Sequence, residues 1–180
     1  MSEQQSTAGS SKIRLILGSL LGVLVAGGVV GFIIFSSICP CERTPGGFLF
    51  GDRADEVVTD WSFANQVELC QIQIWAGIRP HAVNLNCMST PDGKLYLSCS
   101  VCDTKYWASK VEPNESGRLR LDGVVHSVVV NRITDPAEMD RAWRARDIKL
   151  NTMIQNPVGA PQPGAPRADR WWTFNVVSSL

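Results

Sequence analysis

The fold is decided by residues 81–99, HAVNLNCMSTPDGKLYLSC, which predict two strands joined by a tight turn. Within the turn, Pro91 fixes its own φ, Asp92 can hydrogen-bond to its own backbone, and Gly93 supplies a positive φ. Apolar and polar residues alternate on both sides of the turn, which is the pattern of strands with one buried face. The segment therefore predicts an antiparallel hairpin.

The register of this hairpin follows from polarity. A three-residue loop pairs Leu85 with Cys99 and Asn86 with Ser98, so that apolar residues face apolar residues. A two-residue loop would instead pair Cys87 with Ser98 and mix the two faces. The polar side chains then share one face, which is either a solvated surface or a binding surface. They belong to Asn84, Asn86, Ser98 and Ser100.

Patterns on either side of the hairpin predict a small barrel. Four more strands are expected over residues 67–75, 118–121, 124–131 and 170–177. Short helices are expected over 55–64, 104–111 and 135–147, and an extended connection over 154–170. The dipeptide Asp122-Gly123 is a strong signal for a two-residue hairpin loop. A last strand that returns after a long crossover indicates a mainly β, α+β fold with Greek-key connections.

One transmembrane helix is predicted over residues 15–38. Residues 15–35 have no charge, and at about 1.5 Å per residue they can cross a hydrocarbon core of about 30 Å. Glycines at four-residue spacing within this span would let two such helices approach closely, although Gly is also common in membrane helices. The expected domains are a cytoplasmic tail (1–14), the transmembrane helix (15–38), a linker (39–54) and the barrel domain (55–180).

Two alternatives to an uncleaved anchor fit the sequence less well. A cleaved signal peptide would share the basic start at Lys12 and Arg14, but its apolar run usually covers only about 7–15 residues. A lipoprotein site at Cys39 would need a small residue where Ile38 stands. We therefore expect a single-pass anchor in the cell membrane. Because the basic residues precede it, the barrel is expected on the extracytoplasmic side.

The charge balance excludes one class of partner. Lys plus Arg is 17 and Asp plus Glu is 17, so the formal net charge is zero, whereas general nucleic-acid binders have a basic surplus. Hydrophobic residues make up 44% of the chain, which excludes disorder throughout. The sequence has no nucleophile elbow, no phosphate-loop glycine pattern and no His-rich metal motif, so it gives no support to a hydrolase.

The cysteines permit several interpretations. Cys70 and Cys87 lie in apolar strand patterns and are interpreted as small core residues. The Cys99-x-x-Cys102 pair is a redox pair, half of a metal site, or chance, and a redox pair is expected at the start of a helix rather than the end of a strand. A four-Cys zinc site would combine it with the pair near the anchor. An even count in an oxidising space also permits disulfides. The six are Cys39, Cys41, Cys70, Cys87, Cys99 and Cys102.

Five short segments occur in a familiar order between about residue 60 and residue 177. They are Trp61-Ser62-Phe63, DGKLYL (92–97), Lys105-Tyr106-Trp107, GRLRLDG (117–123) leading into VVVNRITDP (128–136), and Trp171-Trp172-Thr173-Phe174. Together they make this region similar to the flavin-binding split-barrel group, which includes pyridoxamine 5'-phosphate oxidase-like proteins and deazaflavin-dependent reductases. The resemblance implies a split β-barrel and a homodimer with the cofactor at the subunit interface.

The resemblance also implies a cofactor site. The flavin phosphate would lie against the polar hairpin face and the basic, aromatic segment after it, where a dianion finds a cation with hydroxyl and amide donors. Trp107 would form a wall of the ring site. The cofactor would be FMN, or alternatively a deazaflavin or haem. The matching positions are Asn84, Asn86, Ser98, Ser100, Lys105, Trp107 and Lys110. Lys110 and Glu115 depart from the family pattern, which often has Asn and Pro there.

Three functions remain open at this point. The first is a membrane-anchored FMN- or deazaflavin-dependent oxidoreductase, in which the cofactor supplies the hydride chemistry. The second is a module on the same fold that binds a cofactor or haem without turnover. The third is a membrane scaffold stabilised by thiols or disulfides. The sequence identifies neither a substrate nor catalytic residues.

Overall fold

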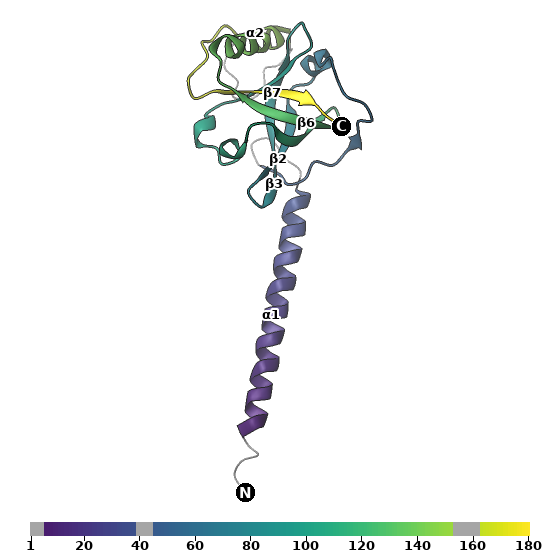
Figure 1. The fold of residues 1–180 in the computed structure, drawn as a ribbon, viewed down its shortest axis with the longest axis vertical. Coiled ribbons are helices and arrows are strands. Elements are labelled where there is room, and N and C mark those ends of the chain that lie inside the picture. The colour runs from purple at the N-terminus through teal and green to yellow at the C-terminus, as the bar shows by residue number, and fades with distance from the viewer. Residues whose placement is uncertain (1–5, 39–44, 153–162) are drawn as a thin grey trace. The chain divides into compact units, whose positions relative to one another are not determined.

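The computed structural model describes residues 6–38, 45–152 and 163–180. It divides into two compact units, a helix ending at Ser37 and a domain beginning at Ile38 (Figure 1). In helix α1 (Ser6–Ser37), an 18-residue stretch within Lys12–Ser37 has a mean hydropathy of 2.4 and none of its residues is buried. Among the described residues, α1 is therefore the one helix long and apolar enough to cross a membrane, and it lies where the sequence predicted a span.

The domain is a closed antiparallel barrel. Along the sheet the strands follow the order β6-β5-β2-β3-β4-β7, and β6 also pairs with β7, which closes the barrel. The last strand thus lies between β4 and β6, as a strand returning after a long crossover must. The predicted mainly β, α+β barrel is confirmed. Its strands are β2 (Cys70–Ala76), β3 (Arg79–Ser89), β4 (Leu95–Cys99), β5 (Glu115–Leu121), β6 (Val124–Ile133) and β7 (Trp172–Ser178).

The β3–β4 hairpin has the register predicted from polarity. Asn86 pairs with Ser98 and Cys87 pairs with Leu97. The turn between the strands is closed by the Gly93 amide, which donates to the Thr90 carbonyl at 2.9 Å. Gly93 has a φ of 80°, a left-handed conformation that explains why glycine is needed at this position.

The β5–β6 hairpin also turns where the sequence predicted. Asp122 has a φ of 47° and Gly123 has a φ of 84°, and two consecutive positive φ values are the requirement of a type I′ loop. Leu119 pairs with His126 across this hairpin. The Asp-Gly signal therefore fixed both the loop length and the register.

Several boundaries differ from the sequence expectations. The helix expected over 55–64 is the 3₁₀ helix η1 (Ser62–Gln66), and β2 begins three residues later than expected, at Cys70. Helix α2 (Pro136–Thr152) continues past residue 147. The helical segment expected over 104–111 is two short 3₁₀ turns, η2 (Cys102–Thr104) and η3 (Ala108–Lys110). Most of the connection expected over 154–170 lies outside the described residues.

Part of the expected linker packs on the barrel. Strand β1 (Asp52–Arg53) pairs with β6 in parallel, and the side chain of Leu49 is buried. The Leu49 amide donates to Oε1 of Gln73 at 2.8 Å. A two-residue strand has no detectable alternation, which explains why the sequence pattern missed it.

Two apolar layers position the hairpin. Residues such as Leu85, Leu97 and Phe174 fill the barrel interior. On the outer face of the same strands, Met88 and Tyr96 pack against Ala142 and Ala145 of α2 in the layer drawn near the top of Figure 1. The polar hairpin residues therefore share an outer face with the residues that α2 covers.

Candidate functional site

Asn86 of β3 and Ser98 of β4 form the centre of the candidate site. They are directly opposite each other in the ladder, and only 9% of Asn86 and 5% of Ser98 is exposed. Among the described residues, Asn86 Nδ2, Asn86 Oδ1 and Ser98 Oγ have no hydrogen-bond partner. Leaving a buried polar group unsatisfied costs about 1–3 kcal/mol. This pair supplies three of the eight such atoms among the described residues, on two directly opposed side chains.

A lysine follows this pair along the chain. The Cys99–Cys102 disulfide folds the segment after β4 back, with the two Cα atoms 5.5 Å apart. The Lys105 amide then donates to the Cys102 carbonyl at 3.1 Å, which holds Lys105 near the end of β4. Lys105 is half-buried, and burial lowers the pKa of its ammonium group. No ion pair joins it to a carboxylate among the described residues, and Ser100 lies in the turn between β4 and Lys105.

Two other residues implied by the family resemblance are a core aromatic residue and an exposed lysine. Trp107 is 4% exposed and belongs to the barrel core. Its ring centroid is 5.4 Å from that of Phe174, so the ring packs inside the barrel and not on the polar face. Lys110 is exposed, with its Nζ 5.4 Å from the centre of the Tyr106 ring.

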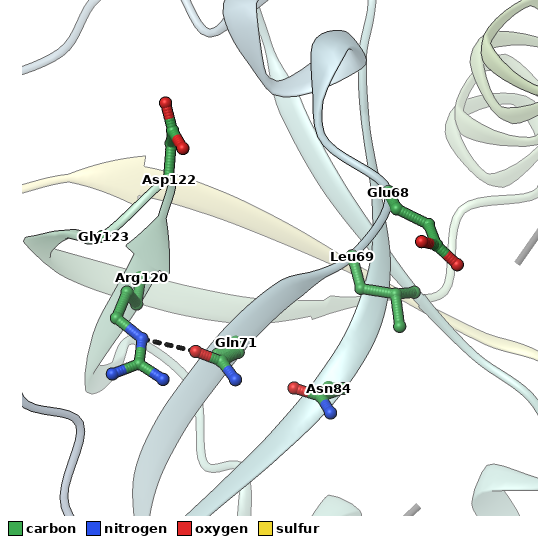
Figure 2. Close-up of a pocket in the computed structure, with 7 residues that line it drawn as sticks. All are labelled: Glu68, Leu69, Gln71, Asn84, Arg120, Asp122 and Gly123. Carbon is green, nitrogen blue, oxygen red and sulfur yellow. Dashed lines mark hydrogen bonds between the residues drawn. The ribbon is translucent and has the colours of Figure 1, made fainter. Parts of the chain in front are cut away.

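Asn84 lines a separate cleft of about 420 Å³ on the same strand face (Figure 2). Arg120 spans one wall of this cleft, with its Nε donating to Gln71 Oε1 and its Nη1 donating to the Phe50 carbonyl at 2.6 Å. Asn84 and Gln71 are cross-strand neighbours. The structure therefore assigns Asn84 to this polar cleft, whose other lining residues are Glu68, Leu69, Asp122 and Gly123.

Helix α2 contributes two buried cations that the sequence analysis missed. Arg146 and Lys149 are both 0% exposed. The Arg146 guanidinium lies 4.5 Å from the centre of the Trp143 ring and 5.5 Å from that of Trp171, and its Nη1 is 3.2 Å from Asp147 Oδ1. The available signal was spacing, because both cations continue the helix face that begins with the expected stripe residue Ala142.

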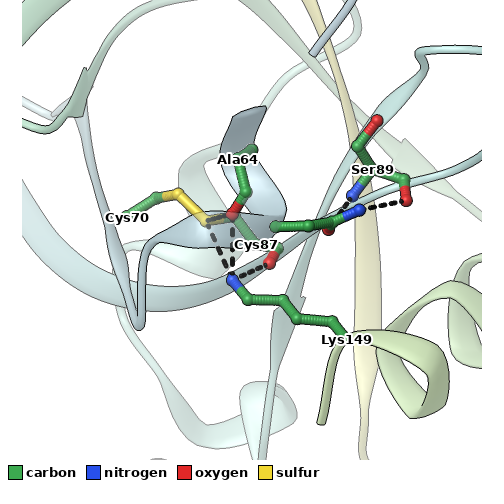
Figure 3. The surroundings of a disulfide bond; sticks show 6 residues. Ala64, Cys70, Cys87, Ser89 and Lys149 are labelled. Atoms are coloured by element: carbon green, nitrogen blue, oxygen red, sulfur yellow. Dashed lines mark hydrogen bonds between the residues drawn. A yellow bond between two sulfur atoms is a disulfide. The ribbon is translucent and has the colours of Figure 1, made fainter. Parts of the chain in front are cut away.

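Lys149 is held by backbone carbonyls beside a disulfide (Figure 3). Its Nζ donates to the Ala64 carbonyl at 3.1 Å and to the Cys87 carbonyl at 2.5 Å. Nζ is also 3.8 Å from Cys87 Sγ. Burial lowers the pKa of Lys149 to about 8. Lys149 therefore attaches the end of α2 to Cys87 of β3, which lies between Asn86 and Met88 in the chain.

The described residues contain two disulfides, both in the core. Cys70 is bonded to Cys87, and Cys99 is bonded to Cys102. The interpretation of Cys70 and Cys87 as small core residues was therefore incomplete, because they are buried but also covalently joined. While Cys99 and Cys102 are bonded to each other, neither supplies the free thiolate that a metal site needs. Cys39 and Cys41, the other half of the zinc alternative, lie outside the described residues.

Both histidines are packed within the barrel. Burial lowers the pKa of His81 and of His126, which favours the neutral imidazole at each position. The ring centroid of His126 is 5.1 Å from that of Trp61, as expected for a histidine that packs rather than reacts. Neither histidine adjoins the Asn86–Ser98 pair in the strand ladder.

Comparisons with known proteins give distant structural neighbours. No protein-family model matches this chain, and no curated protein matches it. A candidate pyridoxamine 5'-phosphate oxidase from Listeria innocua is 14% identical over 65% of this chain and 88% of its own, with a TM-score of 0.41. The FAD-binding protein from Mycobacterium smegmatis is 13% identical over 67% of this chain and 88% of its own, with a TM-score of 0.41. A NimC/NimA family protein from Clostridium acetobutylicum is 12% identical over 64% of this chain and 74% of its own, with a TM-score of 0.40.

Proposed function

We propose that this protein is a membrane-anchored barrel that binds the phosphate of FMN on the outer face of β3 and β4. The observation that supports this is the Asn86–Ser98 pair, whose three polar atoms are buried and have no partner among the described residues. Polar groups in such a position are retained at a cost in stability. A ligand that hydrogen-bonds to them would remove that cost.

The residues fit a phosphate group in their chemistry. A phosphate dianion is bound well by a cation together with neutral hydrogen-bond donors, because charge-assisted hydrogen bonds are the stronger ones. Lys105 would supply the cation, Ser98 and Ser100 the hydroxyl groups, and Asn86 the amide donor. The absence of an ion pair at Lys105 within the described residues leaves its charge available for such an anion.

The proposed activity is an oxidoreduction. A bound flavin would supply the hydride chemistry, while the chain binds and orients it. The resemblance described above implies this class and extends to a deazaflavin in place of FMN. Because Trp107 is used in the core, another surface must cover the ring system. A second copy of the chain is the proposed source, as in the homodimers that the resemblance implies.

The proposed location is the extracytoplasmic side of the cell membrane. Two buried disulfides fit a domain that folds in an oxidising space, and Lys12 and Arg14 precede the span in the orientation that keeps basic residues inside. In α1, no described heavy atom lies within 4 Å of a Cβ placed at Gly18 or Gly22. This small-residue face would let two anchors pack closely in a dimer.

The test is an absorption spectrum of the detergent-purified full chain, before and after adding FMN, a deazaflavin or haemin. Protein-bound flavin bands that remain after gel filtration would support the proposal. A Soret band formed only with haemin would replace it with the haem-binding alternative. No bound chromophore with any of the three would contradict it and favour the disulfide-stabilised scaffold.

A further inference from the structure

The domain presents an exposed aromatic surface that neither the barrel core nor the candidate site uses. Phe50 is 60% exposed, Trp75 is 49% exposed, Ile78 is 93% exposed and Tyr106 is 51% exposed. Large apolar side chains that gather at the surface usually mark a contact with a partner or a membrane. We call these four residues, together with Phe48, the aromatic surface.

The aromatic surface gathers around the β2–β3 turn. The Phe48 ring centroid is 6.4 Å from that of Phe50 and 6.0 Å from that of Trp75. Trp75 lies two residues before Gly77 and Ile78 directly follows it, at the turn between β2 and β3. A Cβ on Gly77 would lie 3.0 Å from Tyr106 Oη. The rings of Phe48, Phe50 and Trp75 therefore form one cluster, and Ile78 and Tyr106 lie at the adjoining β2–β3 turn.

Two basic residues border the aromatic surface at Tyr106. The guanidinium carbon of Arg79 lies 6.0 Å from the centre of the Tyr106 ring, and Lys110 Nζ lies 5.4 Å from it on the exposed side. Aromatic rings with lysine and arginine at their edge are the composition found at the level of lipid headgroups, where the rings reach the acyl boundary and the cations reach the phosphates.

The chain connects this surface directly to the end of the apolar helix. The helix ends at Ser37, and the carbonyl of the next residue, Ile38, accepts a hydrogen bond from the Gly47 amide at 2.8 Å. Phe48 follows Gly47 in the chain. Phe48 is therefore one residue away from a hydrogen bond to Ile38, the first residue after α1 in the chain.

We propose that the aromatic surface inserts into the phospholipid interface of the membrane that holds α1. This inference rests on the proposed anchoring of α1 and adds the face of the barrel that touches the lipid. A phospholipid surface is favoured over a second copy of the chain for two reasons. The short chain connection to α1 keeps the aromatic surface near the membrane, and the bordering cations match lipid phosphates.

The test uses the full chain in vesicles of phosphatidylcholine and phosphatidylglycerol, prepared with ordinary lipids or with lipids brominated near the top of the acyl chains. Bromine quenches tryptophan fluorescence on contact. We expect brominated vesicles to quench the wild type, and Trp75→Phe to abolish most of that quenching. Trp143→Phe removes a tryptophan of α2 whose Nε1 donates to the Ala165 carbonyl at 2.8 Å. This variant should leave the quenching unchanged.

Each other outcome overturns the inference. Quenching that persists in Trp75→Phe, or that is absent in the wild type, would show that the aromatic surface does not contact lipid. A dimer cross-linked through the aromatic surface would assign this surface to a second copy of the chain. Failure of the chain to float with the vesicles would refute the anchoring of α1 as well. Flotation without quenching at Trp75 would refute only the lipid-facing surface.

Discussion

Asn86 and Ser98 face each other across β3 and β4, and both side chains are buried with no hydrogen-bond partner among the described residues. Most buried polar groups in native proteins are paired, so each exception needs a physical reason. Places where a fold departs from its own packing rules are often functional sites. This relationship is the reason for placing the proposed phosphate site on this face of the barrel.

The first prediction separates a binding role for Asn86 from a structural one. Asn86→Leu should stabilise the ligand-free domain by about 1–3 kcal/mol, because it removes an unsatisfied buried amide of similar size. Its affinity for FMN should fall. Thermal unfolding followed by circular dichroism, with and without FMN, measures both effects.

Asn65→Leu is the matched control for that experiment. The Asn65 amide donates to the Ser89 carbonyl at 3.0 Å and accepts from the Ser89 amide at 2.8 Å. Its replacement should therefore destabilise the domain by about 1–3 kcal/mol. A loss of stability in Asn86→Leu as large as that in Asn65→Leu would show that Asn86 is a structural residue.

The second prediction concerns the disulfides. Cys70 and Cys87 are 17 residues apart, whereas Cys99 and Cys102 are 3 apart. In the chain-entropy account the longer loop constrains the unfolded chain more, so loss of the first bond should cost about 3 kcal/mol and loss of the second about 2 kcal/mol. Paired Cys→Ala variants and their unfolding midpoints compare the two.

The redox state of the same four cysteines can be read directly. Alkylation of unfolded protein isolated without reductant should leave Cys70, Cys87, Cys99 and Cys102 unmodified in mass spectrometry. After reduction all four should be modified. Four modified thiols before reduction would refute both bonds, together with the argument for an oxidising compartment that rests on them.

The third prediction follows from Lys149. Burial lowers its pKa from 10.5 to about 8 in the folded domain. Below pH 8 the Lys149 ammonium group is charged in both the folded and the unfolded chain, so the full cost of burying it is present. Between pH 8 and 10.5 the unfolded chain holds the extra proton, so stability should rise with pH, by at most about 3 kcal/mol.

Lys149→Met supplies the reference for this pH dependence. The difference in unfolding midpoint between the wild type and the variant should change in favour of the wild type as pH increases from 8 to 10.5. Only the pH dependence of the difference is used, because the variant also leaves the Ala64 and Cys87 carbonyls without their donor. A difference that is constant over this range would contradict the lowered pKa.

Much of the barrel could be predicted because the deciding signals are local. The polarity of Asn86 and Ser98 set the register of one hairpin, and Asp122-Gly123 set the other. Site residues were harder to place, since alternation gives the face of a strand but not what covers it. Asn86 and Ser98 were expected on a polar face, and only the structure shows that they are buried and unsatisfied.

The features that the sequence analysis did not predict also have physical explanations. A half-cystine in a strand has the same apolar pattern as a free thiol, so Cys70 and Cys87 gave no sign of their bond. A charged residue on a helix normally indicates a solvent-exposed position. The sequence pattern therefore did not show that Arg146 and Lys149 are buried. Trp107 lies in a short 3₁₀ region without periodicity, and its direction follows from its packing on Phe174.

The most direct test of the central claim is an FMN titration of three forms of the full chain in detergent, followed by equilibrium dialysis. Lys105→Ala removes the proposed phosphate cation, and Lys94→Ala removes an exposed lysine of the β3–β4 turn as a control. A charge-assisted hydrogen bond is worth about 1.5–3 kcal/mol, so Lys105→Ala should weaken FMN binding roughly 10- to 100-fold, while Lys94→Ala matches the wild type. Equal affinity in all three forms, or no binding by the wild type, would contradict the proposed phosphate site.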